Sequence, residues 1–406
     1  MQKSLLSFLL ITFFACGSGD KKESRYTEGQ ISSLQLDSTK ILMAKTDSMI
    51  IIDLNPFLHR QHFDFETMVK EIKLIPLETT DESLVDDIYK IVVTDSNIYI
   101  MDDFKGRGLI IFDREGKFVK RMSHGQGPGE LNRLYDIAYD TEKNELITYQ
   151  HSFLLFFTPS GKYIRQMKLP FGFFNFTILP NGYIFKALDS QGNGHLGTLE
   201  DYTLFITDKK FKLKSVGMYY PPKGKVITDY DYIYSNNKNI HITQPYNDTI
   251  YEYINEIGQL NAKYVLNYSK KKLPDNYLNY NSFADFDKLT RQNDYYFYIG
   301  RYRDTKTHHV FFLENSYLGT RTVIYRDKRS GNMRGGTDAD FNVNEIPPIA
   351  FPIGVFNNYF ISSILPIKND SIFLNSSFIS SDDKLKIKGL TEENNPVLVF
   401  FQLKDF

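Results

Sequence analysis

One sequence pattern occurs twice in the chain, at an offset of 45 residues. Residues 111–122 read IFDREGKFVKRM and residues 156–167 read FFTPSGKYIRQM, so that a Gly-Lys pair, an aromatic residue, a β-branched residue and a final Met align. Residues of alternating character flank the Gly-Lys pair, which is typical of two strands joined by a tight turn. The pattern therefore predicts a repeated β-hairpin, and a chain built on such a repeat folds by placing copies of one unit side by side.

Strand-like segments precede these hairpins and recur to the end of the chain. Their marker positions are 98, 146, 183, 240, 310 and 360, a mean spacing of about 52 residues. Four-stranded propeller blades repeat at roughly 40 to 50 residues, and insertions lengthen some of them. Short runs of Ile, Tyr, Phe and Val broken by Gly, Asn and Asp also favour strands over helices. We therefore expect an all-β fold, a six-bladed β-propeller with four-stranded blades.

The ring of a propeller has to close, and the two ends of the chain supply the candidate strands. Segments 69–77 and 396–401 each read as a strand without a hairpin of its own. Pairing them would remove two exposed strand edges, so we expect the N- and C-terminal strands to share the last blade. The main helical candidate is 281–292, where Phe283, Phe286 and Leu289 are spaced for one apolar face.

The N-terminus carries the marks of an export signal. A basic residue, Lys3, is followed by an apolar run from Leu5 to Phe14, and the only cysteine of the chain is Cys16. The run is too short to span a bilayer as a helix. Residues 13–16 (FFAC), with a polar stretch behind them, resemble the lipobox of bacterial lipoproteins, although Phe stands where Leu is commonest. We expect cleavage to leave Cys16 as an acylated first residue; the alternative is a secreted protein with a leftover thiol in its signal.

These features divide the chain into three predicted parts: a lipoprotein signal peptide (1–15), a lipid-anchored tether and lead-in (16–60) and the propeller (61–406). A single cysteine excludes a disulfide within the chain and a multi-cysteine metal site. The formal net charge of −1 argues against a nucleic-acid partner, which calls for a clustered basic surface. The chain has no Trp, whereas WD40, kelch, sialidase and quinoprotein propellers use Trp at repeated positions.

Four segments together resemble one protein family. They are 74–79 (LIPLET), 124–130 (HGQGPGE), 247–251 (NDTIY) and 395–399 (NPVLV). They are similar to segments of the six-bladed β-propeller lipoproteins of gut and oral Bacteroidetes, which are related to NHL repeats, and the likeness runs through nearly all of the chain after the signal. The resemblance implies an exported lipoprotein without an established catalytic activity. By analogy it implies an accessory role in nutrient uptake at the outer membrane, with a transporter, a glycan or a peptide as partner.

Segment 124–130 is also the main candidate for a binding site. Its three glycines and one proline exclude regular structure, so it must form a shaped loop. In one interpretation, His124, Gln126 and Glu130 face a ligand at a mouth of the propeller. In the other, the loop is a connection between blades that needs glycine for its backbone angles. The pair His59 and His62 has no third ligand nearby in the sequence, so we expect no metal there.

Signatures of catalysis are scarce. The sequence contains no Gly-x-Ser-x-Gly elbow, Walker loop, His-Glu-x-x-His or EF-hand pattern. The serious alternative to a binding protein is a metal-dependent hydrolase of the lactonase or gluconolactonase type, in which carboxylates from several blades hold a divalent metal in the central channel. Acidic pairs such as Asp86-Asp87 and Asp102-Asp103 are candidates, although turn roles explain them more simply. Three or more carboxylates that converge in the channel would favour the hydrolase.

The sequence therefore predicts a binding or interaction module without catalytic activity, because a propeller is a rigid scaffold with variable loops at either mouth. No catalytic residue, metal ligand or cofactor is predicted. We expect Cys16 to hold the module in the cell envelope of a bacterium, with the outer membrane as its location.

Overall fold

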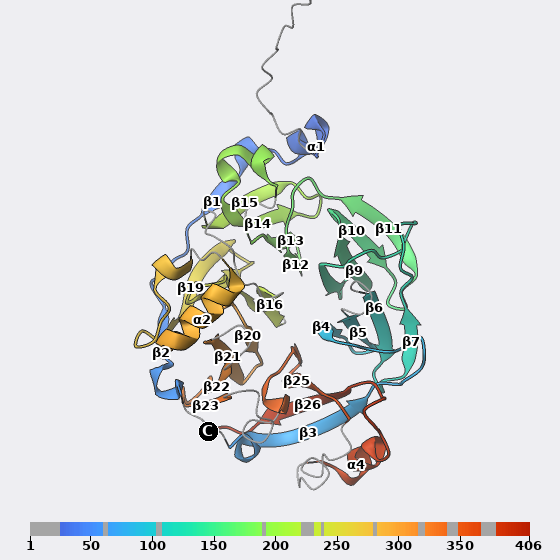
Figure 1. Cartoon of the computed structure of the whole chain (residues 1–406). Helices are drawn as coiled ribbons and strands as arrows, with labels where there is room; N and C mark the ends of the chain where they lie inside the picture. Colours follow the sequence, from blue (N-terminus) through green and yellow to red (C-terminus); the bar gives the residue numbers. More distant parts are fainter. Residues whose placement is uncertain are drawn as a thin grey trace, which may run out of the picture.

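The chain forms six small sheets arranged in a ring in the computed structural model (Figure 1). The structure describes residues 25–59, 64–102, 108–188, 192–220, 231–236, 239–278, 282–315, 321–338, 348–366 and 379–406. Within these ranges no helix is both long enough and apolar enough to cross a membrane. Six sheets of four core strands around one axis make a six-bladed β-propeller, so the predicted fold class is confirmed.

We number the blades 1 to 6 by the chain order of their inner strands. Blade 1 holds β4 (Ile88–Val93), β5 (Asn97–Asp102), β6 (Gly108–Asp113) and β7 (Phe118–Arg121), and blade 2 holds β8 (Asp136–Asp140), β9 (Glu145–Gln150), β10 (Phe153–Phe157) and β11 (Tyr163–Lys168). Blade 3 holds β12 (Asn175–Leu179), β13 (Gly182–Lys186), β14 (Tyr202–Asp208) and β15 (Leu213–Tyr219). Blade 4 holds β16 (Ile233–Asn236), β17 (Asn239–Ile242), β18 (Thr249–Ile254) and β19 (Gln259–Asn267). Blade 5 holds β20 (Tyr302–Asp304), β21 (His308–Glu314), β22 (Arg321–Asp327) and β23 (Met333–Asp338), and blade 6 holds β24 (Gly354–Phe356), β25 (Tyr359–Ile364), β26 (Val397–Leu403) and β3 (Val69–Pro76).

Blade 6 is built from both ends of the chain. The outer strand β3 pairs antiparallel with β26, from Val397 opposite Pro76 to Leu403 opposite Val69. The burial pattern of β3 places Val69, Ile72 and Leu74 in the core, because its apolar residues face the junction with blade 5. The predicted closure of the ring by the two terminal strands is therefore confirmed.

The segment before β3 runs along the outside of the ring as a belt (Figure 1). Strand β1 (Lys40–Leu42) adds to the outer strand β15 of blade 3, and β2 (Ile50–Asp53) adds to β19 of blade 4, both in parallel register. Farther along, the carbonyl oxygen of Phe57 accepts a hydrogen bond from Thr337 of blade 5 at 3.2 Å. The belt thus passes blades 3, 4 and 5 in order before the chain enters blade 6 as β3. Much of the predicted lead-in 16–60 is part of the folded ring.

Few helices interrupt the strands. In the described residues they are the α-helices α1 (Glu28–Ser33), α2 (Phe283–Asn293) and α4 (Ser381–Ile387) and the 3-10 helices η1 (Leu36–Ser38), η2 (Asn55–Phe57), η3 (Glu66–Met68), η4 (Gly194–Leu199), η5 (Asp275–Leu278) and η6 (Pro348–Ala350). Helix α2 confirms the helical candidate at 281–292. The Ser282 side chain caps its first turn by accepting a hydrogen bond from the backbone N–H of Asp285, and Phe286 is fully buried.

Apolar side chains fill each of the six junctions between neighbouring blades, one cluster to a junction. The 28 Tyr and 33 Phe supply the large rings of these clusters, since the chain has no Trp. At the junction of blades 2 and 3, for example, the rings of Tyr149 and Phe173 stack with centroids 3.7 Å apart. Each such ring buries about 150–250 Å² and fixes the angle between two blades.

The repeated sequence pattern corresponds to the turn between the third and fourth strands of a blade. Gly116 in blade 1 and Gly161 in blade 2 occupy the same turn position, at φ of 85° and 77°. The corresponding residue of blade 3 is Phe211, at φ 62°. Only the left-handed conformation closes this turn, and glycine adopts it without strain. Phe211 adopts it because its ring stacks on Tyr183 at a centroid distance of 4.7 Å.

Two of the family-like segments form a latch beside the ring closure. The Asn395 side chain, which is 2 % exposed, accepts a hydrogen bond from the Val85 N–H at 2.8 Å and donates to the carbonyls of Glu78 and Ser83 at 2.7 and 2.8 Å. Glu78 in turn accepts a hydrogen bond at 2.7 Å from the N–H of Phe118 in blade 1. The segments LIPLET and NPVLV therefore tie blade 6 to blade 1.

The two glycines of the repeat allow a matched test of the turn. A Cβ atom added at Gly116 would lie 2.2 Å from the backbone oxygen of Pro76 in β3, whereas one added at Gly161 would meet the flexible Met122 side chain at 2.6 Å. Both alanine substitutions strain a left-handed residue, at a cost of about 1 kcal/mol. We expect Gly116→Ala to cost about 1–3 kcal/mol more than Gly161→Ala, because only Gly116 abuts rigid backbone. Urea unfolding measures both, and equal losses would contradict the predicted contact with β3.

Candidate functional site

The two mouths of the ring differ in the length of the chain that connects the strands. The inner strand of each blade begins at one mouth, where the connections between blades arrive: 77–87, 122–135, 169–174, 220–232, 268–301 and 339–353. The second and third strands of each blade are joined on the same side, among others by 187–201 and 365–396. The other mouth has short turns such as 94–96, 141–144 and 180–181. We call the first the long-loop mouth.

A lysine lies where the inner strands of the blades begin, at the long-loop mouth. We call this part of the central channel the neck. The Lys90 ammonium of β4 is 2.6 Å from Oδ1 of Asp136 in β8 and 3.2 Å from Oδ1 of Asp231, which precedes β16. Asp136 is completely buried, while the side chains of Lys90 and Asp231 are 15 % and 18 % exposed. One ammonium group therefore joins blades 1, 2 and 4 and neutralises part of the charge of two carboxylates.

Burial and charge act in opposite directions on these groups. Burial raises the pKa of the Asp136 carboxyl to about 6, although the Lys90 ammonium lowers it. Burial also pulls the pKa of Lys90 down, but the carboxylates of Asp136 and Asp231 outweigh it and raise that pKa above its ordinary value. At neutral pH the Asp136 carboxyl and the Lys90 amine are charged, and the buried carboxylate depends on the ammonium for its stability in the neck.

Backbone and side-chain hydrogen bonds continue this network around the neck. Asp136 accepts a bond from the Phe176 N–H of blade 3 at 2.8 Å, and Asn175 accepts one at 3.0 Å from the N–H of Tyr232, next to blade 4. Tyr234 donates to the carbonyl of Gly300 at 2.9 Å, and Arg303 of blade 5 donates to the carbonyl of Ile353 at 3.1 Å. The neck is thus held by polar contacts between successive blades, as well as by the apolar junctions.

The neck bears on the hydrolase alternative. Its carboxylates Asp136 and Asp231 converge, but on a lysine and not on one another. In the described part of the chain, no three His, Cys, Asp or Glu side chains are placed to hold a metal ion. Of the acidic pairs, Asp102 accepts hydrogen bonds from the N–H groups of Asp86 and Asp87 at 2.9 and 3.2 Å, which is a turn role, and Asp103 lies outside the described residues.

The loop 124–130 connects blade 1 to blade 2 on the side of the long-loop mouth. His124 and Gln126 are exposed, whereas Glu130 is half-buried and its carboxylate accepts a hydrogen bond from the Gly127 N–H at 2.8 Å. A Cβ atom at Gly125 would lie 2.0 Å from a carboxylate oxygen of Glu130, so this glycine makes room for the carboxylate. Glu130 thus helps to shape its own loop, and His124 and Gln126 are left facing solvent.

His59 and His309 occupy different surroundings. His59 forms an ion pair with Asp294 at 2.7 Å, and His62 lies outside the described residues. His309 is buried between blades 4 and 5, where it is 2.6 Å from the Tyr302 hydroxyl and 2.9 Å from Asp304. Burial lowers the pKa of His309 to about 4, so the ring is neutral at pH 7. These contacts join two blades and lie away from the long-loop mouth.

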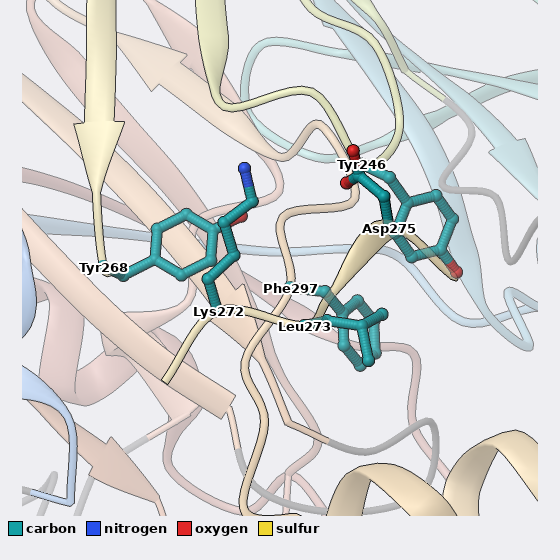
Figure 2. Close-up of a pocket in the computed structure, with 6 residues that line it drawn as sticks. All are labelled: Tyr246, Tyr268, Lys272, Leu273, Asp275 and Phe297. Atoms are coloured by element: carbon teal, nitrogen blue, oxygen red, sulfur yellow. The ribbon is translucent and has the colours of Figure 1, made fainter. Parts of the chain in front are cut away.

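A small hollow lies beside helix α2 in the connection from blade 4 to blade 5. Figure 2 shows its six lining residues: Tyr246, Tyr268, Lys272, Leu273, Asp275 and Phe297. Its cavity volume of about 10 Å³ leaves room for about one water molecule. Asp248, next to the hollow, accepts a hydrogen bond from Tyr268 and pairs with Lys272. The NDTIY segment that contains Asp248 therefore also serves the packing of a connection.

Comparison with known proteins places the chain in a family. Residues 49–402 match the family described as a domain of unknown function, DUF4934. The chain belongs to this family. No curated protein matches the sequence of this DUF4934 member.

Among solved structures, the chain is similar to a Bacteroides fragilis protein that is named as exported, with 17 % sequence identity, a TM-score of 0.70, and coverage of 88 % of this chain and 100 % of that one. The extracellular domain of a one-component system of B. thetaiotaomicron has 14 % identity and a TM-score of 0.34, covering 66 % and 29 %. BamB of Moraxella catarrhalis has 11 % identity and a TM-score of 0.33, covering 65 % and 66 %. The match to the Bacteroides fragilis protein covers the whole of that neighbour, so the two chains share the propeller fold.

The ion triad of the neck generates a double-mutant test. Lys90→Met leaves Asp136 buried and without its cation, so we expect a loss of about 3–5 kcal/mol in unfolding free energy at neutral pH. Lys90→Met combined with Asp136→Asn should recover much of the loss, since a neutral amide needs no counterion. Chemical denaturation of the single and double variants measures the coupling. Strictly additive losses would show that the two side chains do not stabilise each other.

A second lysine near the neck makes the stability depend on pH. Lys186 of β13 is completely buried and donates to the carbonyl of Ala187 and the hydroxyl of Thr203, both at 2.8 Å, and burial lowers its pKa to about 7. The unfolded lysine keeps its proton up to about pH 10, so between pH 7 and 9.5 the unfolding free energy should rise by up to about 1.4 kcal/mol per pH unit.

Denaturation at several pH values checks this dependence on Lys186. Lys186→Met should be more stable than the natural protein at pH 7 and lack the alkaline rise, while Lys214→Met, at an exposed position of β15, should keep it. A rise that persists in Lys186→Met would assign the effect to another group.

Proposed function

We propose that this protein is a binding protein of the bacterial cell envelope, anchored by lipid on Cys16, that presents its long-loop mouth to a partner. The observation that carries the proposal is the asymmetry of the ring. The connections from all six junctions, most of them long, join strand ends at one mouth, and short turns join the strands at the other. Loops on a rigid scaffold are where binding residues concentrate, because they vary without cost to the core.

Export and anchoring are supported by the N-terminal sequence. Its apolar run ends at a lone cysteine, which is the arrangement of a lipoprotein signal. The structural neighbour from Bacteroides fragilis, matched over its whole length, is named as exported. The proposal includes the outer membrane as the location, and an accessory role in nutrient uptake there as the context of binding.

The neck supports binding over metal-dependent hydrolysis. Between Asp136 and Asp231, the Lys90 ammonium takes the place that a divalent cation would need. A resident ammonium neutralises the carboxylates without offering an open coordination position for a substrate or for water. For this reason we prefer a binding function to the lactonase-like alternative.

The loops of the mouth and the size of the hollow bear on the kind of partner that we propose. The hollow in Figure 2 has room for one water molecule, so it does not enclose a small ligand. A protein surface, an extended peptide or a glycan suits an open mouth lined by loops better. Within the loop 124–130, His124 and Gln126 are the exposed polar side chains that would contact such a partner, and Glu130 would hold the loop in shape.

Site-specific crosslinking in the native envelope tests the proposed mouth. A photoreactive residue at Gln126 should form a discrete adduct with a protein or glycan, while the same residue at Ser160, exposed in a short turn of blade 2, should not. Equal adducts at both positions, or none at Gln126, would contradict the assignment of the mouth. In the same cells Cys16→Ala should release the protein from the membrane fraction, and unchanged fractionation would refute the lipid anchor.

A further inference from the structure

The belt exposes an unusual number of apolar side chains. Ile41, Met43, Met49, Ile50 and Ile51 belong to β1, β2 and the chain between them, and Met43 and Ile51 are 80 % and 65 % exposed. Tyr219 and Ile257, from the blades that the belt covers, are exposed as well. We call these seven residues the apolar rim. Single exposed apolar residues are common on soluble proteins, but a group of them marks a surface that another body covers.

The register of the belt places these residues along one side of the ring. Leu42 of β1 pairs with Gly217, two residues before Tyr219, and Lys45 bridges to Asn261 of β19. Ile50 then pairs with Tyr264 of the same strand. Five residues of the rim therefore lie on one run of chain over the outer strands of blades 3 and 4, and Tyr219 and Ile257 belong to those blades themselves. Strands β1 and β2 each end their five-stranded sheet, so the rim is also the outer edge of both blades.

The point where the chain enters the ring lies close to this edge. Tyr26 is 4 % exposed, and its hydroxyl is 3.4 Å from the Ser152 hydroxyl of blade 2. Its ring packs against His195 of blade 3 at a centroid distance of 4.8 Å. Helix α1 and β1 follow on the same side of the ring (Figure 1). Arg25 is nine positions after Cys16, a stretch that spans at most about 30 Å.

Basic side chains accompany the part of the rim that lies on blade 3. Lys40 of β1, Lys214 of β15 and Lys210 of the turn before it are exposed. Apolar side chains that enter the interfacial layer, together with lysines that attract anionic headgroups, are the chemistry of a lipid surface. Protein partners that pair with a strand edge would have no comparable need for these lysines.

We propose that the apolar rim rests on the surface of the bilayer that holds the Cys16 anchor. This inference depends on the lipid anchor of the proposed function and adds an orientation to it. With blades 3 and 4 against the membrane, the ring stands on its edge and the long-loop mouth opens sideways, along the membrane. A partner in the same membrane then reaches the mouth without crossing the open periplasm or medium.

Fluorescence in lipid vesicles tests the orientation. The full acylated chain offers no free thiol, since Cys16 is its only cysteine, so a single new cysteine can be labelled with an environment-sensitive dye. Met43→Cys probes the rim, and Leu385→Cys in α4 on blade 6, at 65 % exposure, is the matched control. In vesicles of phosphatidylethanolamine and phosphatidylglycerol with nitroxide lipid, we expect at least about twofold stronger quenching at position 43 than at position 385.

The possible outcomes test the membrane contact of the rim and the lipid anchor separately. Equal quenching at the two positions in protein that floats with the vesicles overturns the rim and leaves the anchor intact. Protein that does not float refutes the anchor and, with it, the orientation. A dye at position 43 that is shielded in proportion to protein concentration, without lipid quenching, makes the rim an interface between two copies and overturns the membrane contact. Ile41→Glu with Ile51→Glu, introduced beside the labelled Met43→Cys, should abolish the difference in quenching while flotation persists.

Discussion

The pairing of β3 with β26 is the constraint on which the rest of the structure depends. Each blade buries its two faces only against neighbours, so an open ring would leave the junction faces of two blades in water. Closure by the two ends of the chain makes the sixth junction, and the Asn395 latch fastens it to blade 1. It also fixes the course of the belt, since the chain before β3 must travel around blades 3 to 5 to reach its place.

Two kinds of contact hold the six blades together: apolar packing at the junctions and polar contacts at the neck. Phe and Tyr rings fill the junctions, where their area and stacking geometry replace the tryptophans found in other propellers. At the neck, polar contacts from Asp136, Asn175 and Tyr234 join successive blades. The Lys90 ammonium reaches Asp231 of blade 4 and thus ties blades that are not neighbours. Buried ionic contacts of this kind specify one arrangement more than they stabilise it.

The periodic part of this fold could be predicted from the sequence, and the rest could not. Hairpins, the closing strands and α2 were predictable because their signals are local or repeat along the chain. Strands β1 and β2 are only 3 and 4 residues long and pair in parallel with strands that are distant in the sequence. No hairpin pattern therefore predicts them. The Lys90 triad joins residues from three blades, and a pattern search along one chain does not find such a set. For the loop 124–130 the sequence leaves a ligand contact and a structural connection open, and it does not predict the hydrogen bond that Glu130 accepts from the Gly127 N–H.

The family-like segments contribute to the construction of the ring, and HGQGPGE also carries the exposed side chains of His124 and Gln126. LIPLET and NPVLV form the latch, HGQGPGE connects blades 1 and 2, and NDTIY orders the connection beside the hollow of Figure 2. Backbone geometry and buried hydrogen bonds require the residues of the latch, whereas exposed side chains of the long-loop mouth can vary without cost to the core. In the proposed function, recognition uses these exposed side chains of the mouth, among them His124 and Gln126. The apolar rim belongs to this variable part as well, since β1 and β2 contribute backbone pairing to the ring whatever side chains they expose to the outside.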